Sequence, residues 1–377
     1  MGRHRKRQRK HPLRISRSVA LVATGLLIPL TGTAVVFAAT GDPAHPLKGL
    51  SRTGQAPARR SAAGAPSPMH PPSGGVASSS PLPRTPPTAP AHASSSARPL
   101  IGFTPYVDVL AWPLLNLAKL HAKSFTMGFV AAGAGCSATW DGLSPVDASS
   151  AVTRVKDVPG RVIVAFGGPR DVELAQSCDS VDALAGEYQK AIDATHPSAL
   201  DFFLSDTTLG DTSSVQRRTE ALARVQKGHD RPLSITLPLH RSGLPANALG
   251  VLRSTATAGL PVAIINLVPV DGIGGSVTSA ATAAHAQLQK LYHQSDAQVW
   301  QRMGLTPVIG VAGGGLPFRP ADARQLLSWA TGRGIGRLSM WSLTRDTPCT
   351  VDTNVINDTC SGLDEDAGVF SKIFQGF

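Results

Sequence analysis

Short apolar runs rich in β-forming residues alternate with helical segments over most of this chain, and this alternation constrains its fold more than any other feature. Eight runs follow residue 99, at Leu100–Val109, Phe125–Ala131, Arg161–Gly168, Ala199–Asp206, Leu233–Leu239, Val262–Val270, Thr306–Ala312 and Arg337–Leu343. Helix-like segments between them include Ser180–Thr195, Ser214–Lys227, Ser279–Gln294 and Pro320–Gly332. Strands that are apolar almost throughout are buried on both faces, which is typical of a parallel sheet covered by helices.

Eight strand–helix units in a segment of this length predict an α/β fold, a (β/α)8 TIM barrel over residues 99–377. A doubly wound open sheet is the alternative. That fold would place a glycine-rich phosphate-binding turn after the first strand, where this chain has Val107-Asp108-Val109. In a barrel, functional side chains lie at the carboxyl ends of the strands, so those ends are where a site is expected.

The charges of the chain are unevenly distributed. Residues 1–98 contain 14 Lys or Arg and one acidic residue, Asp42, whereas residues 99–377 contain 22 basic and 24 acidic residues. The formal net charge of +11 therefore belongs to the N-terminal part. The predicted barrel is slightly acidic, which argues against a nucleic-acid-binding domain.

The N-terminal part has the pattern of an export segment followed by a linker. Residues 1–17 are basic and residues 18–39 form an uncharged apolar run, long enough for a bilayer that takes about 20 residues. We expect a transmembrane anchor with the barrel outside the cell membrane, or a signal peptide cleaved near Ala39, which would leave the protein secreted. Residues 40–98 are rich in Pro, Ser and Ala and predict a disordered linker.

The four cysteines predict disulfide bonds. An even number of cysteines in an exported domain favours two bonds, for which three pairings exist. Cys349 and Cys360 close a short loop and are the easiest pair to form, which leaves Cys136 with Cys178. The chain has no C-x-x-C pair of the kind found in zinc sites, and we expect neither a metal nor a cofactor.

Several strand ends, in this order, resemble glycoside hydrolase family 18, the chitinase family, and most closely its exported bacterial members. The matching segments are Phe103–Val109 with its Pro-Tyr-Val-Asp, Ala165–Gly168 in place of an S-x-G-G element, Ile235–Pro238, Gly334–Trp341 and Phe370–Phe374. The resemblance covers nearly all of residues 99–377. It implies a barrel that acts on polymers of N-acetylglucosamine.

The most diagnostic motif of that family, D-x-x-D-x-D-x-E on the fourth strand, is degenerate here. Its four positions are occupied by Ser198, Asp201, Phe203 and Ser205, so only the second is kept. In the family the last Glu protonates the leaving oxygen and the last Asp stabilises the attacking acetamide. Neither Ser205 nor Phe203 is able to do this, because a serine hydroxyl is not acidic near neutral pH and a phenyl ring carries no charge.

The resemblance also marks residues that would contact a sugar. On the sixth strand, Val270-Asp271-Gly272 stands where the family often has Met-Asp-Tyr, so Asp271 is kept and the tyrosine hydroxyl is replaced by Gly272. Trp341 matches the aromatic floor of the central sugar subsite, and an aromatic face stacks on a pyranose ring. We expect Trp341, Tyr106 and Asp271 to contact a ligand. Asp201 is a further ligand candidate, with a buried, hydrogen-bonded structural role as the alternative. Further aromatic candidates are Trp112 and Trp140, and the nearby acids to consider as replacements for the lost one are Asp206 and Asp211.

These observations predict a chitinase-like extracytoplasmic protein that has lost its catalytic residues. We expect it to bind chitin or another N-acetylglucosamine-containing glycan, as a monomer held at the membrane by its N-terminal segment. One alternative is an active or weakly active chitinase that cleaves β-1,4-linked N-acetylglucosamine polymers. A second alternative is a protein-interaction module without a sugar site.

Overall fold

The computed structural model describes residues 100–111, 117, 120, 122–169, 172–270, 276–312, 315–350 and 357–377. The predicted basic segment, apolar segment and linker over residues 1–98 lie outside this range. Within it, no helix is both long enough and apolar enough to cross a membrane. Every structural statement below concerns the described residues.

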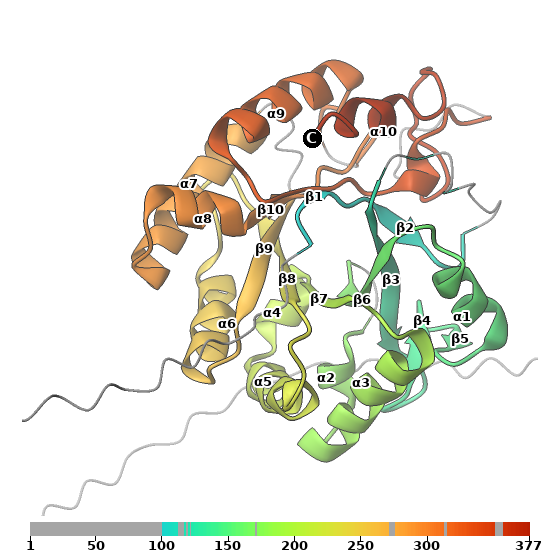
Figure 1. Cartoon of the computed structure of the whole chain (residues 1–377), viewed down its shortest axis with the longest axis vertical. Coiled ribbons are helices and arrows are strands. Elements are labelled where there is room, and N and C mark those ends of the chain that lie inside the picture. Colours follow the sequence, from blue (N-terminus) through green and yellow to red (C-terminus); the bar gives the residue numbers. More distant parts are fainter. Residues whose placement is uncertain are drawn as a thin grey trace, which may run out of the picture. The chain divides into compact units, whose positions relative to one another are not determined.

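Eight parallel strand positions form a closed barrel (Figure 1). In chain order they are β1 (Gly102–Phe103) continued by β2 (Tyr106–Asp108), β3 (Ser124–Ala132), β6 (Arg161–Gly168), β7 (Ala199–Leu204), β8 (Leu233–Leu239), β9 (Val262–Pro269), β10 (Met303–Leu305) and β11 (Arg337–Leu338). The first strand closes the barrel because β1 pairs with β11 while β2 pairs with β3. The predicted (β/α)8 fold is therefore confirmed.

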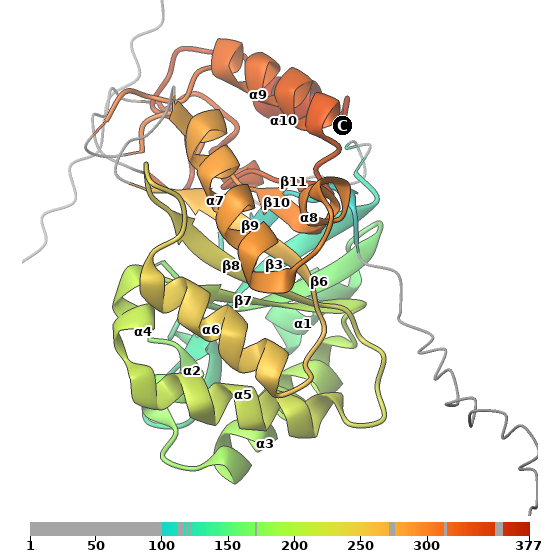
Figure 2. The same cartoon turned by 90° about the vertical axis from the view of Figure 1, so that its left-hand side faces the viewer.

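Helices surround the barrel and bury its outer face (Figure 2). They are α1 (Ser149–Lys156), α2 (Leu174–Ser177), α3 (Val181–Thr195), α4 (Asp206–Gly210), α5 (Thr212–Gln226), α6 (Ala246–Thr257), α7 (Val277–Tyr292), α8 (Asp296–Arg302), α9 (Pro320–Arg333) and α10 (Val369–Phe374). Local signals explain several ends: the Ser180 side chain caps α3, Pro320 opens α9, and Gly334 ends α9 in the left-handed conformation.

The sheet differs from the sequence prediction in several places. The first predicted strand is divided into β1 and β2, and β11 ends at Leu338 although its predicted run extends to Leu343. The strand expected at Thr306–Ala312 is instead β10, which ends at Leu305, and the following residues form only isolated bridges at Val308 and Gly310. Pro307 has no N–H to give to a regular ladder, which accounts for the interruption. A hairpin of β4 (Ala138–Trp140) and β5 (Ser144–Pro145), which the prediction lacked, extends the sheet beyond β3.

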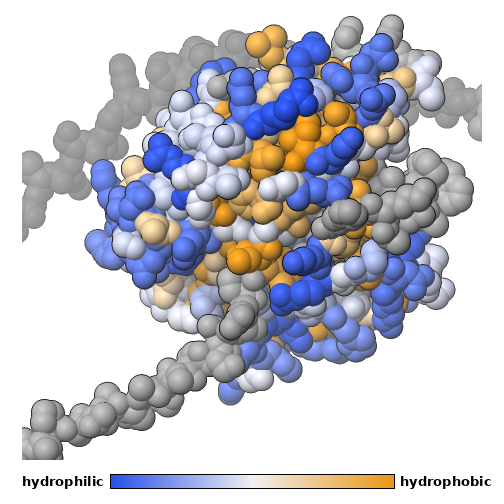
Figure 3. Space-filling model, turned by 45° about the horizontal axis from the view of Figure 1, so that its top comes forward, coloured by the Kyte–Doolittle hydropathy of each residue, from blue (hydrophilic) through white to orange (hydrophobic). Residues whose placement is uncertain are grey.

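The apolar core has two main layers. The larger lies between the barrel and its helices, where the strands' outward side chains pack, and a smaller cluster fills the barrel interior at the carboxyl ends of the strands. On the face shown in Figure 3, hydrophilic side chains cover the periphery and apolar ones gather toward the centre. Both predicted disulfides are present: Cys136 is bonded to Cys178, and Cys349 to Cys360.

Candidate active site and its altered chemistry

Asp201 lies at the centre of the barrel and is fully buried. Its carboxylate accepts hydrogen bonds from the Tyr106 hydroxyl at 2.9 Å, from Ser234 Oγ at 2.5 Å and from Thr236 Oγ1 at 2.8 Å. Arg337 reaches the same network by donating to Ser234 Oγ at 3.1 Å. The two expected ligand contacts Asp201 and Tyr106 are thus bonded to each other, and the Asp201 carboxylate has no exposed surface.

Burial is the main influence on the pKa values of the Asp201 carboxyl and the Tyr106 hydroxyl. It raises the pKa of the Asp201 carboxyl, while the bonds from Ser234 and Thr236 and the charge of Arg337 oppose that rise. Burial, followed by the charge of Asp201, holds the pKa of the Tyr106 hydroxyl well above its ordinary value. At neutral pH Tyr106 is therefore a hydrogen-bond donor to Asp201, and its ring meets that of Trp341 edge-on with the centroids 5.7 Å apart.

Phe203 projects into the barrel, as alternation along β7 predicts. Its ring meets that of Phe129 edge-on, with the ring centroids 5.3 Å apart. Phe129 in turn stacks on Trp341, with the centroids 5.2 Å apart. Gly167 allows the backbones of β6 and β7 to approach closely at Phe203, since a Cβ on Gly167 would lie 2.2 Å from the Phe203 carbonyl oxygen and its φ is +88°. An aromatic cluster thus stands where the family pattern has a carboxylate.

Ser205 is not on the strand with Phe203. The strand β7 ends at Leu204, and Ser205 is the N-cap of α4, where its hydroxyl accepts the Thr208 N–H at 3.3 Å and lies 3.1 Å from Thr208 Oγ1. The strand predicted at Ala199–Asp206 therefore ends two residues early, and Ser205 lies outside it. Its side chain instead starts the next helix, because serine is a favoured N-cap residue.

The two neighbouring acids that could replace the lost general acid have other partners. Asp206 lies 3.1 Å from the His240 ring at Nε2. Asp211 caps α5 by accepting from the N–H groups of Ser213 and Ser214, and its bond from the Ser213 hydroxyl lowers the pKa of its carboxyl. In the described part of the chain, neither residue lines the two cavities beside Trp341 that are presented next.

Two cavities adjoin Trp341, whose side chain is 8% exposed. The first, called the apolar cavity below, has a volume of about 200 Å³ and is lined by Tyr106, Phe203, Val268, Thr306, Val308 and Trp341. The second, called the acidic cavity, has a volume of about 270 Å³, and its lining includes Asp108, Phe129, Asp141, Leu143 and Trp341. Pro169 and Asp358 line both cavities. Trp341 is therefore placed where a ligand could reach it.

The acidic cavity contains carboxylates that sequence reasoning did not select. Asp108 ends β2 and accepts the N–H groups of Leu110 and Ala111, and Asp141 accepts the Phe129 N–H at 3.0 Å. Burial raises the pKa of the Asp108 carboxyl, and the charge of Asp358 adds to this rise. The signal available in the sequence was its position, because Asp108 stands at the carboxyl end of the first strand.

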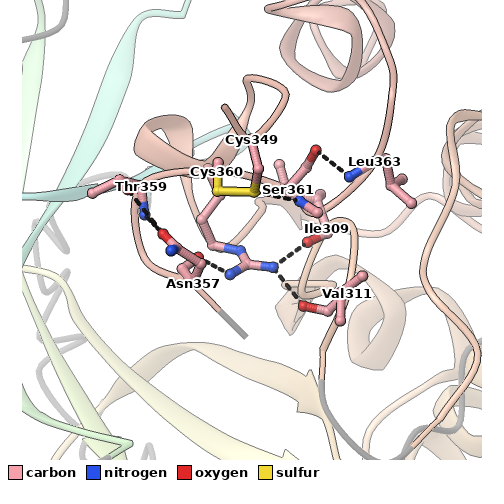
Figure 4. The surroundings of a disulfide bond; sticks show 10 residues. Ile309, Val311, Cys349, Asn357, Thr359, Cys360, Ser361 and Leu363 are labelled. Atoms are coloured by element: carbon pink, nitrogen blue, oxygen red, sulfur yellow. Dashed lines mark hydrogen bonds between the residues drawn. A yellow bond between two sulfur atoms is a disulfide. The ribbon is translucent and has the colours of Figure 1, made fainter. Parts of the chain in front are cut away.

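Asp358 lies on a segment held by a disulfide (Figure 4). The Cys349–Cys360 bond closes this segment, and Arg345 secures it by donating to the carbonyl oxygens of Ile309, Val311 and Asn357. Val311 N–H also donates to the Ser361 carbonyl oxygen at 2.7 Å. The disulfide thus positions one wall of both cavities.

The remaining candidates divide into two groups. Asp271, Gly272 and Trp112 lie outside the described residues. Trp140 is fully buried and donates its Nε1–H to the Val146 carbonyl oxygen, so it belongs to the core. Across the described ranges, no group of three or more His, Cys, Asp or Glu side chains is arranged to hold a metal ion.

Curated relatives are chitinases. The chain is 30% identical over 309 residues to a probable bifunctional chitinase/lysozyme of Escherichia coli strain K12, a match that covers 73% of this chain and 34% of that protein. It is also 30% identical over 278 residues to Endochitinase 11 of Metarhizium anisopliae. That match covers 66% of this chain and 53% of that protein. The chain therefore spans about a third of the length of the first relative and about half of the length of the second. No protein-family model matches the chain.

Solved structures agree with this similarity. The catalytic domain of a hyperthermophilic chitinase from Pyrococcus furiosus superposes with a TM-score of 0.66 and 29% identity, over 74% of this chain and 96% of that one. Catalytic-site mutants of active domain 2 of the Pyrococcus furiosus chitinase, complexed with chito-oligosaccharides, give the same TM-score and identity.

Proposed function

This chain belongs to the chitinases of glycoside hydrolase family 18, and on that basis we propose that its barrel binds an N-acetylglucosamine-containing glycan such as chitin without hydrolysing it. The observation that carries the proposal is what occupies the two catalytic positions of the fourth-strand motif. Phe203 packs in an aromatic cluster, and Ser205 caps a helix. Neither is able to protonate a glycosidic oxygen.

The chemistry requires an acid at a particular place. Removing a general acid typically costs about 10²–10⁴ in rate, and a misplaced group forfeits much of the benefit of proximity. Loss of the charged group that stabilises the acetamide adds to this cost. These two replacements together support binding in place of turnover.

Binding is supported by the groups that remain around Trp341. Its indole adjoins both cavities, and carboxylates such as Asp108 and Asp141 are acceptors for sugar hydroxyls. The Pyrococcus furiosus mutants complexed with chito-oligosaccharides offer a precedent for sugar binding when the catalytic site is altered. The same groups suit recognition of a chain of N-acetylglucosamine units here.

Residual hydrolysis is a second candidate function, which Asp108 favours. A half-buried carboxyl with a raised pKa, in the lining of a cavity that also includes Trp341, has the property required of a general acid. Its place at the end of the first strand differs from the family position on the fourth. Activity that depends on Asp108 would therefore be a rerouted reaction.

The decisive experiment measures binding and cleavage together. The full chain is titrated with chito-oligosaccharides of several lengths, followed by tryptophan fluorescence, while products are separated by chromatography. We expect saturable binding without products. Trp341→Phe should weaken binding about tenfold, through loss of stacking area. Trp329→Phe on α9 is the matched control and should bind normally.

Three results would revise the proposal. Products that disappear in Asp108→Asn would establish the rerouted hydrolase. Products that persist in that variant would point to another acid. Absence of both binding and products would favour a protein-interaction module. A Phe203→Asp, Ser205→Glu double variant that gains cleavage would show that the cleft still admits the substrate.

We also propose that residues 18–39 tether the barrel outside the cell membrane. The support is the sequence alone, a basic flank before an uncharged run and a Pro/Ser/Ala-rich linker after it. The intact mass of the protein purified from membranes and from the medium tests this. A membrane-bound full-length chain is expected, and a soluble species that begins near residue 40 would indicate cleavage.

A further inference from the structure

The walls of the apolar cavity are almost entirely hydrocarbon. Phe203, Val268, Val308 and Trp341 contribute side chains without a charge. Tyr106 and Thr306 also line it, but their polar atoms are bonded elsewhere: the Tyr106 hydroxyl donates to Asp201, and Thr306 Oγ1 donates to Asn266 Oδ1 at 3.0 Å. Of the two remaining described lining residues, Pro169 is apolar and Asp358 carries the one carboxylate; both also line the acidic cavity.

Such a cavity is poorly suited to water or to a sugar ring. A buried water needs two to four polar partners, and a sugar hydroxyl buried without a partner loses its hydrogen bonds to water with nothing in return. A hydrocarbon group meets no such cost and gains dispersion contacts with the walls. The replacement of a carboxylate by Phe203 therefore changes which chemical group this part of the barrel accepts.

We infer that the apolar cavity is a binding site for a small aromatic or branched hydrocarbon group. Its volume of about 200 Å³ exceeds the roughly 150 Å³ at which an apolar cavity in another protein stays dry and binds benzene. The adjoining rim is also apolar in part, since Leu143 lines the acidic cavity and is 81% exposed. An acetyl group would leave most of this volume empty.

The hydrocarbon could arrive as a free ligand or as a substituent on a sugar held in the acidic cavity. The first form does not depend on glycan binding, whereas the second rests on the proposed function. A pair of ligands separates them: toluene alone, and the phenyl and methyl β-glycosides of N-acetylglucosamine. A phenyl glycoside that binds more tightly than the methyl glycoside would place the substituent in the cavity.

Calorimetric titration of the full chain with toluene tests the site directly. We expect one site per chain. Val308→Leu adds a methylene to the cavity wall and should weaken toluene binding about tenfold. The matched control is Val162→Leu on β6, a partly buried strand valine that does not line the cavity. It should leave binding unchanged.

A second variant protects the test against misfolding of the first. Phe203→Ala enlarges the cavity and should admit a bicyclic ligand such as naphthalene, which the natural protein should bind at least about tenfold more weakly. Failure of toluene to bind the natural chain would overturn the inference, as would equal toluene affinities in Val308→Leu and Val162→Leu. Toluene binding without chito-oligosaccharide binding would support the cavity and reject the glycan proposal.

Discussion

The Tyr106 hydroxyl donates a hydrogen bond to the Asp201 carboxylate at 2.9 Å, and both residues are buried inside the barrel beneath Trp341. Asp201 is the one position of the fourth-strand motif that this chain shares with the family pattern. In this structure it anchors the first strand to the fourth and, through Ser234 and Thr236, to the fifth. The retained acid therefore supports the floor of the site.

Asp201 should make stability depend on pH. Burial raises the pKa of its carboxyl above the unfolded value of 3.8. Between the two pKa values the folded protein binds more protons than the unfolded one, so the free energy of unfolding falls as pH rises from about 4. In urea titrations across pH, the stability of the natural protein relative to Asp201→Asn should decrease over this window.

Asp211→Asn provides a control of opposite sign for that measurement. The pKa of the Asp211 carboxyl is lowered by its bond from the Ser213 hydroxyl. This group stabilises the fold above its unfolded pKa, and the contribution is lost as pH falls. A pH-independent difference for Asp201→Asn would contradict the assignment of a raised pKa.

Ser205 should behave as a helix cap. Ser205→Ala removes the acceptor of the Thr208 N–H and should lower the free energy of unfolding by about 0.5–2 kcal/mol. Ser205→Asp keeps a capping oxygen and should stay close to the natural stability. Chemical denaturation measures both variants, and equal losses would mean that the cap contributes little.

The buried Glu173–Arg218 ion pair should be sensitive to removal of one partner. The Arg218 Nη2 to Glu173 Oε2 distance is 2.7 Å, and both side chains are at least 96% buried. Arg218→Met leaves a buried carboxylate without its cation, which should cost about 3–5 kcal/mol. Adding Glu173→Gln should restore part of the loss in the same urea titration.

An exposed pair serves as the comparison. Arg224 is paired with Asp182 at a solvent-accessible position, so Arg224→Met should cost less than about 1 kcal/mol. If the two arginine variants lost equal stability, burial would not be the cause of the larger effect expected at Arg218.

The two disulfides should contribute unequally. Their cysteines are separated by 42 residues for Cys136–Cys178 and by 11 for Cys349–Cys360. Loop-closure entropy assigns them about 4 and about 3 kcal/mol respectively. Paired Cys→Ser variants in denaturation experiments should follow that order. The Cys349→Ser, Cys360→Ser variant should also weaken ligand binding, because that bond holds the Asp358 segment beside Trp341.

The sequence by itself determined the barrel, because strands that are buried on both faces and alternate with helices admit few folds. The runs Arg161–Gly168 and Leu233–Leu239 match β6 and β8 residue for residue. The disulfide pairing and the aromatic at the end of the eighth strand could likewise be read from spacing and position. Comparison with the family pattern was enough to recognise that Ser205 replaces the catalytic glutamate.

Tertiary structure alone decided what replaced the lost chemistry. The sequence could not bring Asp108, Asp141 and Asp358 to one cavity, since they follow different parts of the barrel and meet only when it closes. Nor could strand alternation reveal that β7 stops at Leu204, which turns Ser205 into a helix cap. Local pattern fixes which residues face inward. Closure of the sheet into a barrel decides which of those side chains touch. It therefore decides the chemistry available at the carboxyl ends of the strands.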